Sequence, residues 1–322
     1  MMLSFFLVLI MIATPLFIFL FFLFVVLILF LVRFYPSQLL PVSKAINIIT
    51  PEFEKYKNDC LHPCIRYIPE GFSGYKWWMV QSPYYARNNK IENVLLYRSN
   101  EVDFPKNWEF VCIVKDTPEL GYNSDPVLFY ESNKLFVFWR ECATPLCNQL
   151  NVSKIIVGVS TVDSINFSSE KVYLSETKIN SDKEQCPILV KKNDKYIFYA
   201  IHYEYLPQRK NIGLAIWEGS SLDEPDFKYK ETLPLQSVLT CDKWKQFKLF
   251  NRLLFMPKPL KHNYWHFDLF EFNNKLYMVS VDEWGDNIML SVSENYRDFK
   301  AVKTPLINAH YSENIFGYRQ YY

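Results

Sequence analysis

Four similar stretches decide the fold: Asn93-Val-Leu-Leu-Tyr-Arg-Ser99, Lys154-Ile-Ile-Val-Gly-Val-Ser160, Asn211-Ile-Gly-Leu-Ala-Ile-Trp217 and Asn287-Ile-Met-Leu-Ser-Val-Ser293. They begin 61, 57 and 76 residues apart along the chain. Each follows a polar turn and a strand rich in aromatic residues, for example Lys134-Leu-Phe-Val-Phe-Trp139. A near-fixed period indicates one supersecondary unit that is repeated and stacked on its neighbours. A unit of about 60 residues with four short strands is typical of a β-propeller blade.

The repeat predicts four blades, at about residues 60–120, 121–180, 181–240 and 260–305. Too few residues follow for another complete blade, yet residues 44–50 and 313–319 also have the pattern of strands. A fifth blade built from both ends would close the ring and remove its open edge. We therefore predict an all-β fold, a five-bladed β-propeller rather than a four-bladed one, over residues 59–322. Residues 35–58 are predicted to form a linker and entry strand.

The N-terminal region has a different composition. Residues 3–32 contain no charged side chain and are rich in Phe, Leu, Val and Ile. A helix needs about 20 such residues to cross a bilayer, so residues 1–34 are predicted to be a transmembrane anchor. The run is too long for a signal-peptide core and lacks a cleavage site. Arg33 and Lys44 follow the run and no basic residue precedes it, which favours a cytoplasmic globular domain in a single-pass membrane protein.

Charge and cysteine content exclude several classes of ligand. The chain has 35 basic and 34 acidic residues, a net charge of +1, so no nucleic-acid partner is predicted. Neither Cys60 with Cys64 nor Cys142 with Cys147 has a second pair at zinc-site spacing. The sequence therefore predicts no metal site and no cofactor. Buried thiols are favoured for the seven cysteines, and one or two disulfides remain an alternative in an oxidising compartment.

Each predicted blade opens with polar residues just before its first strand. These are His62 before Pro63, Asp125 before Pro126, Glu184-Gln185 before Cys186-Pro187, and the group Trp265-His266-x-Asp268. Taken singly, such an Asp often caps a turn, and such a His often bonds only to a nearby carbonyl. Innermost strands of a propeller line its axis, however, so four polar groups at equivalent places are expected to meet at one end of the channel.

These openings also carry a resemblance to a known family. His62-Pro63, Gly74-Tyr75-Lys76-Trp77-Trp78-Met79, Glu92-Asn93, Ser124-Asp125-Pro126 and Trp265-His266-x-Asp268 are the matching motifs. Together with the blade length, they resemble the five-bladed propellers of glycoside hydrolase family 43, and more narrowly a branch of glycosidase-like bacterial and phage proteins. The resemblance covers roughly residues 60–320 and leaves out the N-terminal run.

The resemblance implies roles for the blade openings. In the hydrolases that the chain resembles, an Asp opening the first blade is the general base. An Asp opening the second tunes the pKa of the acid, and a Glu opening the third is the general acid. Asp125 matches the second role, but His62 stands where the base would be. If the acid lies two residues before Pro187, the position holds Gln185, and Glu184 is offset by one.

We accordingly predict Asp125, His62 and Glu184 as catalytic residues, and His266, Asp268, Trp265 and Gln185 as substrate-binding residues. The predicted function is a membrane-anchored, glycoside-hydrolase-like propeller that acts on a glycan, with the usual catalytic carboxylates partly replaced. The alternatives are a non-catalytic carbohydrate-binding propeller and a protein-interaction propeller. The opening of the third blade discriminates among them, because inverting hydrolysis needs a second carboxyl about 6.5–9.5 Å from the first.

Overall fold

The computed structural model describes eleven segments of the chain. They are residues 14–15, 17–27, 61–84, 88–119, 121–142, 154–175, 182–204, 210–234, 264–282, 287–301 and 307–308. Residues 17–27 are helical, and nearly all of their side chains are exposed, Phe17 by 71%. Within the described segments, no helix has both the length and the apolar character that a bilayer crossing requires. The rest of the predicted anchor and both predicted domain boundaries lie outside the described residues.

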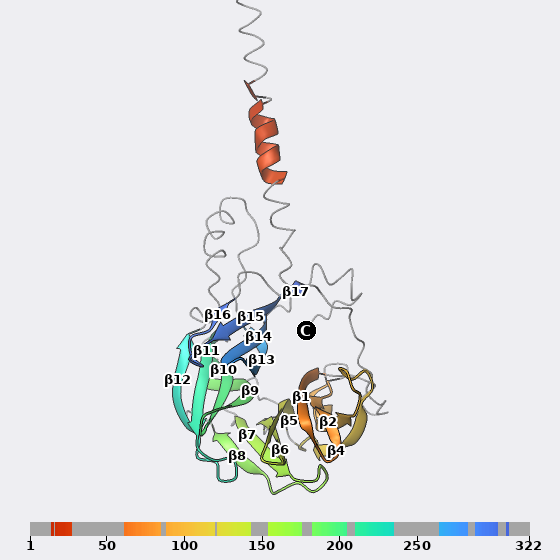
Figure 1. Cartoon of the computed structure of the whole chain (residues 1–322). Helices are drawn as coiled ribbons and strands as arrows, with labels where there is room; N and C mark the ends of the chain where they lie inside the picture. Colours follow the sequence, from red (N-terminus) through yellow and green to blue (C-terminus); the bar gives the residue numbers. More distant parts are fainter. Residues whose placement is uncertain are drawn as a thin grey trace, which may run out of the picture. The chain divides into compact units, whose positions relative to one another are not determined.

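Four antiparallel sheets confirm the predicted propeller blades (Figure 1). Blade 1 comprises β1 (Leu61–Phe72), β2 (Tyr75–Ser82), β3 (Val94–Ser99) and β4 (Glu109–Lys115), with the short 3₁₀ helix η2 (Asn89–Ile91) before β3. Blade 2 comprises β5 (Tyr122–Glu131), β6 (Lys134–Cys142), β7 (Lys154–Thr161) and β8 (Lys171–Ser175). Blade 3 comprises β9 (Asp182–Lys192), β10 (Lys195–Glu204), β11 (Lys210–Gly219) and β12 (Lys228–Pro234).

Blade 4 comprises β13 (Tyr264–Phe272), β14 (Lys275–Asp282), β15 (Asn287–Ser293) and β16 (Lys300–Ala301). The short strand β17 (Ile307–Asn308) also pairs with the first two residues of β15. Residues 44–50 and 313–319, from which a fifth blade was predicted, lie outside the described residues. The chain order of the strands within each blade follows the repeat that the sequence displays.

The first two strands of every blade are joined by two residues. These turns hold Ser73 and Gly74, Ser132 and Asn133, Asn193 and Asp194, and Asn273 and Asn274. In three of the four turns both residues have positive φ, for example 48° and 57° in blade 4. Two positive φ values define the tight turn whose twist matches a β-hairpin, and Asn and Gly adopt them most easily. The turn residues therefore fix the register of the two inner strands.

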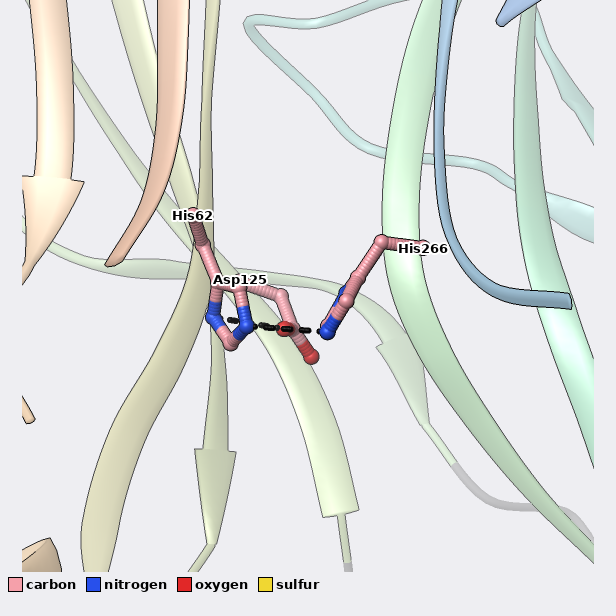
Figure 2. Close-up of side chains that lie close together, drawn as sticks. All are labelled: His62, Asp125 and His266. Atoms are coloured by element: carbon pink, nitrogen blue, oxygen red, sulfur yellow. Dashed lines mark hydrogen bonds and ion pairs between the residues drawn. The ribbon is translucent and has the colours of Figure 1, made fainter. Parts of the chain in front are cut away.

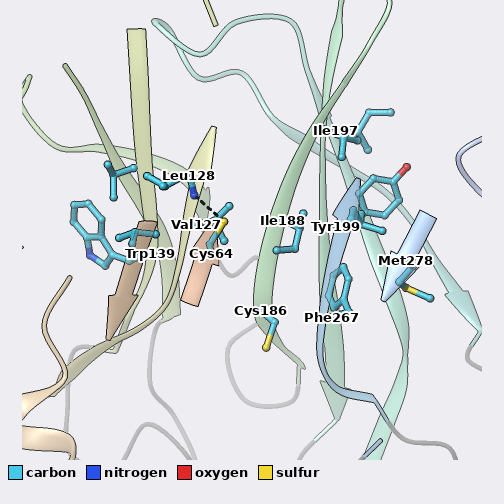
Figure 3. Packing of buried hydrophobic residues seen from close by; sticks show 14 of the residues in the cluster. Cys64, Val127, Leu128, Trp139, Cys186, Ile188, Ile197, Tyr199, Phe267 and Met278 are labelled. Atoms are coloured by element: carbon cyan, nitrogen blue, oxygen red, sulfur yellow. Dashed lines mark hydrogen bonds between the residues drawn. The ribbon is translucent and has the colours of Figure 1, made fainter. Parts of the chain in front are cut away.

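Apolar side chains between the blades form the core. The inner strands β1, β5, β9 and β13 contact one another in sequence around the axis. Figure 3 shows this packing, with Cys64 beside Val127 and with Ile188 near Phe267. Each such buried side chain contributes about 1.5–3 kcal/mol by its removal from water. A second cluster fills the space between blades 2 and 3, where the rings of Phe138 and Phe198 lie 5.2 Å apart.

Gly158 on β7 shows how closely these sheets pack. A Cβ atom at this position would lie 2.5 Å from Cδ1 of Phe138 and 2.8 Å from Cε2 of Tyr173. Real Cβ atoms do not approach other atoms so closely, so even alanine would displace an aromatic ring. The glycine in the second copy of the repeated stretch is therefore required by the aromatic side chains beside it.

Candidate functional site

The same irregularity occurs near the start of the inner strand in three blades. Between Leu61 and Cys64 of β1, two residues face one residue of β2, which makes a β-bulge. The equivalent bulges lie between Ser124 and Val127 of β5 and between Gln185 and Ile188 of β9. Each bulge therefore consists of a residue and the proline that follows it.

The residues before these prolines are His62, Asp125 and Cys186. Their φ angles are 50°, 51° and 52°, so all three have the same left-handed backbone conformation. Proline suits the bulge because no ladder hydrogen bond is needed there, and the bulge redirects the preceding side chain. In blade 4 the pairing shifts between Tyr264 and His266, so a related irregularity precedes His266. The structure thus places Cys186 at the third-blade position that the sequence analysis gave to Glu184 or Gln185.

Three of the predicted site residues meet as predicted. Figure 2 shows His62, Asp125 and His266 pointing toward one another from three different blades. Nε2 of His62 lies 3.0 Å from Nε2 of His266, and Nδ1 of His62 lies 3.2 Å from Oδ1 of Asp125. His62 and His266 are 204 residues apart in the sequence. The inner strands therefore bring distant polar groups together at one place, which we call the His–Asp–His cluster.

Asp125 is a buried anion held by several donors. Nε of Arg140 lies 2.8 Å from Oδ2 of Asp125, and the backbone N–H of Cys186 donates to the same oxygen at 3.3 Å. Burial alone would raise the pKa of Asp125, but the charges of Arg140, His62 and His266 outweigh it. They hold the pKa of this carboxyl well below its usual range. Asp125 is therefore ionised at neutral pH and is not available as a proton donor.

Arg140 is the buried cation beneath the cluster. It extends from β6, and its side chain is 8% exposed. Its Nε and Nη2 donate to Oγ of Ser124 at 3.0 and 2.5 Å, and Ser124 directly precedes Asp125. Although burial lowers the pKa of a guanidinium, Asp125 and other nearby groups keep the pKa of Arg140 well above its usual value. A permanent positive charge therefore lies directly behind the cluster.

The two imidazoles of the cluster have different surroundings. Burial lowers the pKa of His62, the carboxylate of Asp125 opposes this shift, and Arg140 adds to it, so the net change is downward. His266 has Sγ of Cys186 at 2.8 Å from its Nδ1. One ligand atom from each of His62, Asp125 and His266 lies within 4.8 Å of the other two. These three ligand atoms are close enough together to bind one cation.

Glu92 lies next to this group of charges and is 7% exposed. It precedes β3, and its backbone carbonyl accepts a hydrogen bond from the N–H of Asn123 at 3.2 Å. Burial raises the pKa of Glu92 to about 9, Arg140 opposes this shift, and Asp125 and Cys142 add to it. Glu92 therefore carries a proton at neutral pH, in contrast to Asp125.

The other predicted site residues lie beside the cluster. Asp268 on β13 accepts two hydrogen bonds from the guanidinium of Arg66 on β1, both at 3.2 Å. This ion pair joins the inner strands of blades 1 and 4. The side chain of Asp268 is half-buried there. Glu184 pairs with His202 in the register of β9 and β10, and Gln185 pairs with Ile201. Trp265 lies in β13. For these three residues the structure describes the position in the strand and not the side chain.

Sequence reasoning did not assign a role to Arg140, Cys186 or Glu92. For Cys186 a signal was present, because it directly precedes Pro187 as His62 and Asp125 precede their prolines. Glu92 belongs to one of the matching motifs, but nothing in the motif indicates that its side chain is buried. Nothing in the sequence around Arg140 distinguishes it from a surface arginine at the end of a strand. Its role follows from the pairing of Ser124 with Arg140 across β5 and β6.

Comparison with known proteins shows the fold alone. No protein-family model matches the chain. No curated protein matches it by sequence. Among solved structures, an N-acetylgalactosamine deacetylase from F. plautii in complex with blood group B trisaccharide has a TM-score of 0.58 at 12% identity. The match covers 83% of this chain and 76% of the deacetylase.

Two further solved structures have the same fold. A family 117 glycoside hydrolase of the marine bacterium Zobellia galactanivorans has a TM-score of 0.53 at 8% identity, over 80% of this chain and 74% of that one. A xylan β-1,4-xylosidase from Bacillus halodurans has a TM-score of 0.53 at 12% identity, over 76% of this chain and 41% of the xylosidase. The chain is thus a β-propeller similar in fold to propellers of glycoside hydrolases.

Proposed function

We propose that this propeller acts on a glycan at the His–Asp–His cluster. The observation that carries the proposal is the convergence of His62, Asp125 and His266 from the inner strands of three blades. Inner strands line the axis of a propeller, and ligand sites are commonly hollows with a few polar groups held in place. The solved structures of similar fold support a glycan as ligand, since their descriptions name a trisaccharide complex, a glycoside hydrolase and a xylosidase.

The carboxylates expected of a glycoside hydrolase are partly replaced at this site. His62 stands where the resemblance implies a general base, and Cys186 stands at the equivalent position of the third blade. Asp125 retains its residue type and its place. Processing of the glycan is therefore proposed to use Asp125 together with groups other than the two carboxyl groups that serve as general acid and general base in glycoside hydrolases. The second candidate is a carbohydrate-binding propeller without catalysis, which Cys186 at the third-blade bulge favours because a thiol stands where a carboxyl is expected.

Replacing Asp125 with Asn is expected to abolish measurable glycan binding or turnover. The substitution preserves shape and removes the charge that faces both imidazoles. His62→Ala should have the same direction of effect, because it removes the neighbouring ring. Binding to a glycan array and hydrolysis of the bound glycans would be measured on the full-length chain in mild detergent. Asp103→Asn, an exposed carboxylate away from the cluster, is the matched control. Equal behaviour of all four proteins on every bound glycan would contradict the site.

Residues 3–32 are proposed to anchor the chain in a membrane, on the evidence of their charge-free composition. The full-length chain is expected in the membrane fraction after expression, and it should be extracted by detergent but not by high salt. Replacing Leu20 and Leu23 with Arg should release it, because each charge in a bilayer core costs about 2.5–3.5 kcal/mol. Recovery of the unmodified chain without detergent would argue against an anchor. By the flanking charges, the propeller is proposed to face the cytoplasm.

A fifth blade built from both ends of the propeller domain is proposed to close the ring. Deleting residues 313–322 should then lower the melting temperature well beyond the effect of removing a frayed tail, because it would expose a strand edge. Thermal unfolding of the shortened and complete chains measures this difference. Substitution of Tyr321 and Tyr322 by Ser serves as the control for a change in composition alone. An unchanged melting temperature after the deletion would count against closure.

A further inference from the structure

We propose that the His–Asp–His cluster binds one divalent transition-metal ion, with His62, Asp125 and His266 as its protein ligands. Two imidazoles and one carboxylate form a ligand set that Zn²⁺ and Fe²⁺ use in proteins, with further positions left open for water or substrate. The inference deepens the proposed function by giving the same site a cofactor. It was not foreseen from the sequence, whose cysteine spacing gave no zinc pattern.

The spacing of the donor atoms fits a single ion. Metal–nitrogen bonds of about 2.0–2.1 Å at tetrahedral or octahedral angles place neighbouring ligand atoms about 2.8–3.4 Å apart. The two Nε2 atoms of His62 and His266 lie 3.0 Å apart. The ligand atoms of all three residues lie within 4.8 Å of one another. Small rotations of the side chains therefore suffice to bring three donors around one ion.

One atom of the cluster also lacks a good hydrogen bond. Nδ1 of His62 is buried, and among the described residues it has no hydrogen-bond partner, although Oδ1 of Asp125 is 3.2 Å away. The contacts of Asp125 with Arg140 and with the backbone N–H of Cys186 both use Oδ2. Oδ1 is thus the oxygen that faces the imidazoles. Nδ1 of His62 and Oδ1 of Asp125 thus face each other without a hydrogen bond, beside the hydrogen-bonded Nε2 atoms of the two imidazoles, and an ion could take all three residues as ligands.

The residues around the cluster would hold the ligands in place. In metal sites the second nitrogen of a ligating histidine commonly binds another group, which fixes the ring and its tautomer. Sγ of Cys186 lies 2.8 Å from Nδ1 of His266 and leaves Nε2 facing His62. Arg140 and the N–H of Cys186 hold Asp125 by its other oxygen. Cys186 is accordingly a positioning residue for both Asp125 and His266.

The composition of the site selects the class of ion. Ca²⁺ takes six to eight oxygen ligands and Mg²⁺ keeps an octahedral shell of oxygen, much of it water. The cluster offers two nitrogen ligands for each carboxylate, and Arg140 behind Asp125 further reduces the negative charge available to a hard cation. Nitrogen ligands suit borderline ions such as Zn²⁺. Once bound, such an ion supplies a Lewis acid that can polarise a ligand oxygen or activate water.

The test measures metal rather than activity. Full-length chain without a polyhistidine tag would be purified in mild detergent, stripped with EDTA, and titrated with Zn²⁺ against a chromophoric chelator. We expect one equivalent of Zn²⁺ per chain. His62→Ala and His266→Ala should weaken binding by about 100-fold or more, since even loss of an outer partner costs about 10–100-fold. Cys186→Ser should weaken Zn²⁺ binding by about 10–100-fold, as expected for the loss of an outer partner. Cys112→Ser on β4 should leave Zn²⁺ binding unchanged.

Cobalt(II) provides a readout that does not depend on the folding of variants. Loading the stripped wild-type chain with Co²⁺ is expected to give the visible bands of a nitrogen–oxygen site. A strong sulfur-to-cobalt charge-transfer band would instead make Cys186 a ligand and overturn the assignment of three ligands. Zn²⁺ binding at less than a tenth of an equivalent, or binding that His62→Ala and His266→Ala leave unchanged while both variants unfold like wild type, would overturn the site.

The outcomes for the metal and for the glycan are separable. One equivalent of metal in a chain that binds no glycan would support the metal site and contradict the proposed function. Glycan binding by a chain with no affinity for Zn²⁺ or Co²⁺ would support the function and contradict the metal site. Glycan binding that EDTA abolishes and Zn²⁺ restores would connect the two.

Discussion

Replacing Arg140 with Met is expected to lower the free energy of unfolding by about 3–5 kcal/mol, because it leaves a buried carboxylate without its cation. The side chain of Asp125 is 3% exposed and that of Arg140 is 8% exposed, with Nε 2.8 Å from Oδ2. Met has a similar length and fills most of the space. The loss therefore reports the uncompensated charge on Asp125 rather than a cavity.

Urea denaturation of the full-length chain in detergent, with EDTA present, would measure this change. The double variant Arg140→Met with Asp125→Asn should recover most of the loss, since a neutral pair needs no buried counter-ion. Arg297→Met is the control, because its guanidinium is 49% exposed beside Glu218 and exposed ion pairs contribute about 0–1 kcal/mol. If Arg140→Met and Arg297→Met lowered the free energy of unfolding by the same small amount, Arg140 would not be the cation that stabilises Asp125.

Replacing Glu92 with Gln is expected to change how stability depends on pH. The pKa of Glu92 is about 9 in the folded chain, mainly through burial, against an ordinary value of 4.5. Between these values the folded chain keeps a proton that the unfolded chain has lost. Stability of the wild type should therefore fall as pH rises from about 4.5 to about 9, by up to about 1.4 kcal/mol per pH unit from this group. Gln resembles the neutral acid and does not titrate, so the variant lacks this loss.

Unfolding curves in urea at pH 5, 7 and 9 would test the sign. Glu92→Gln should match the wild type near pH 5 and exceed its stability at pH 9. Glu294→Gln is the matched control, because this carboxylate is 78% exposed in its pair with Lys275 and is ionised in both states over this range. Parallel curves for wild type and Glu92→Gln would show that Glu92 is ionised in the folded chain.

The third-blade opening shows where prediction from sequence was incomplete. The resemblance implied that the general acid would be at Glu184 or Gln185. The β-bulge at this opening instead contains Cys186, the residue directly before proline. Proline marks the bulge because it needs no partner for a backbone N–H. The rule was visible at His62-Pro63 and Asp125-Pro126, and applying it a third time would have identified Cys186. The catalytic role predicted for Glu184 stays a prediction.

The repeated blade and the two-residue turns within it could be predicted from the amino-acid sequence, because both depend on local properties. Alternating apolar residues specify a strand, and Asn or Gly accepts the positive φ of a tight turn, as at Asn273 and Asn274. The sequence also placed His62, Asp125 and His266 at equivalent strand openings. That they would meet followed from the symmetry of a propeller and needed no coordinates.

The protonation states of the buried acids depend instead on contacts between residues that are distant in the sequence. The pairing of β5 with β6 puts Arg140 behind Asp125, and the folded chain buries Glu92 near both of these charges. The pKa of a carboxyl depends on burial and on charges within a few ångströms, which come from strands far apart in sequence. Two neighbouring acids are consequently held in opposite states, Asp125 of β5 ionised and Glu92 before β3 neutral. Asp125 has a buried cation beside it, whereas burial dominates the pKa of Glu92.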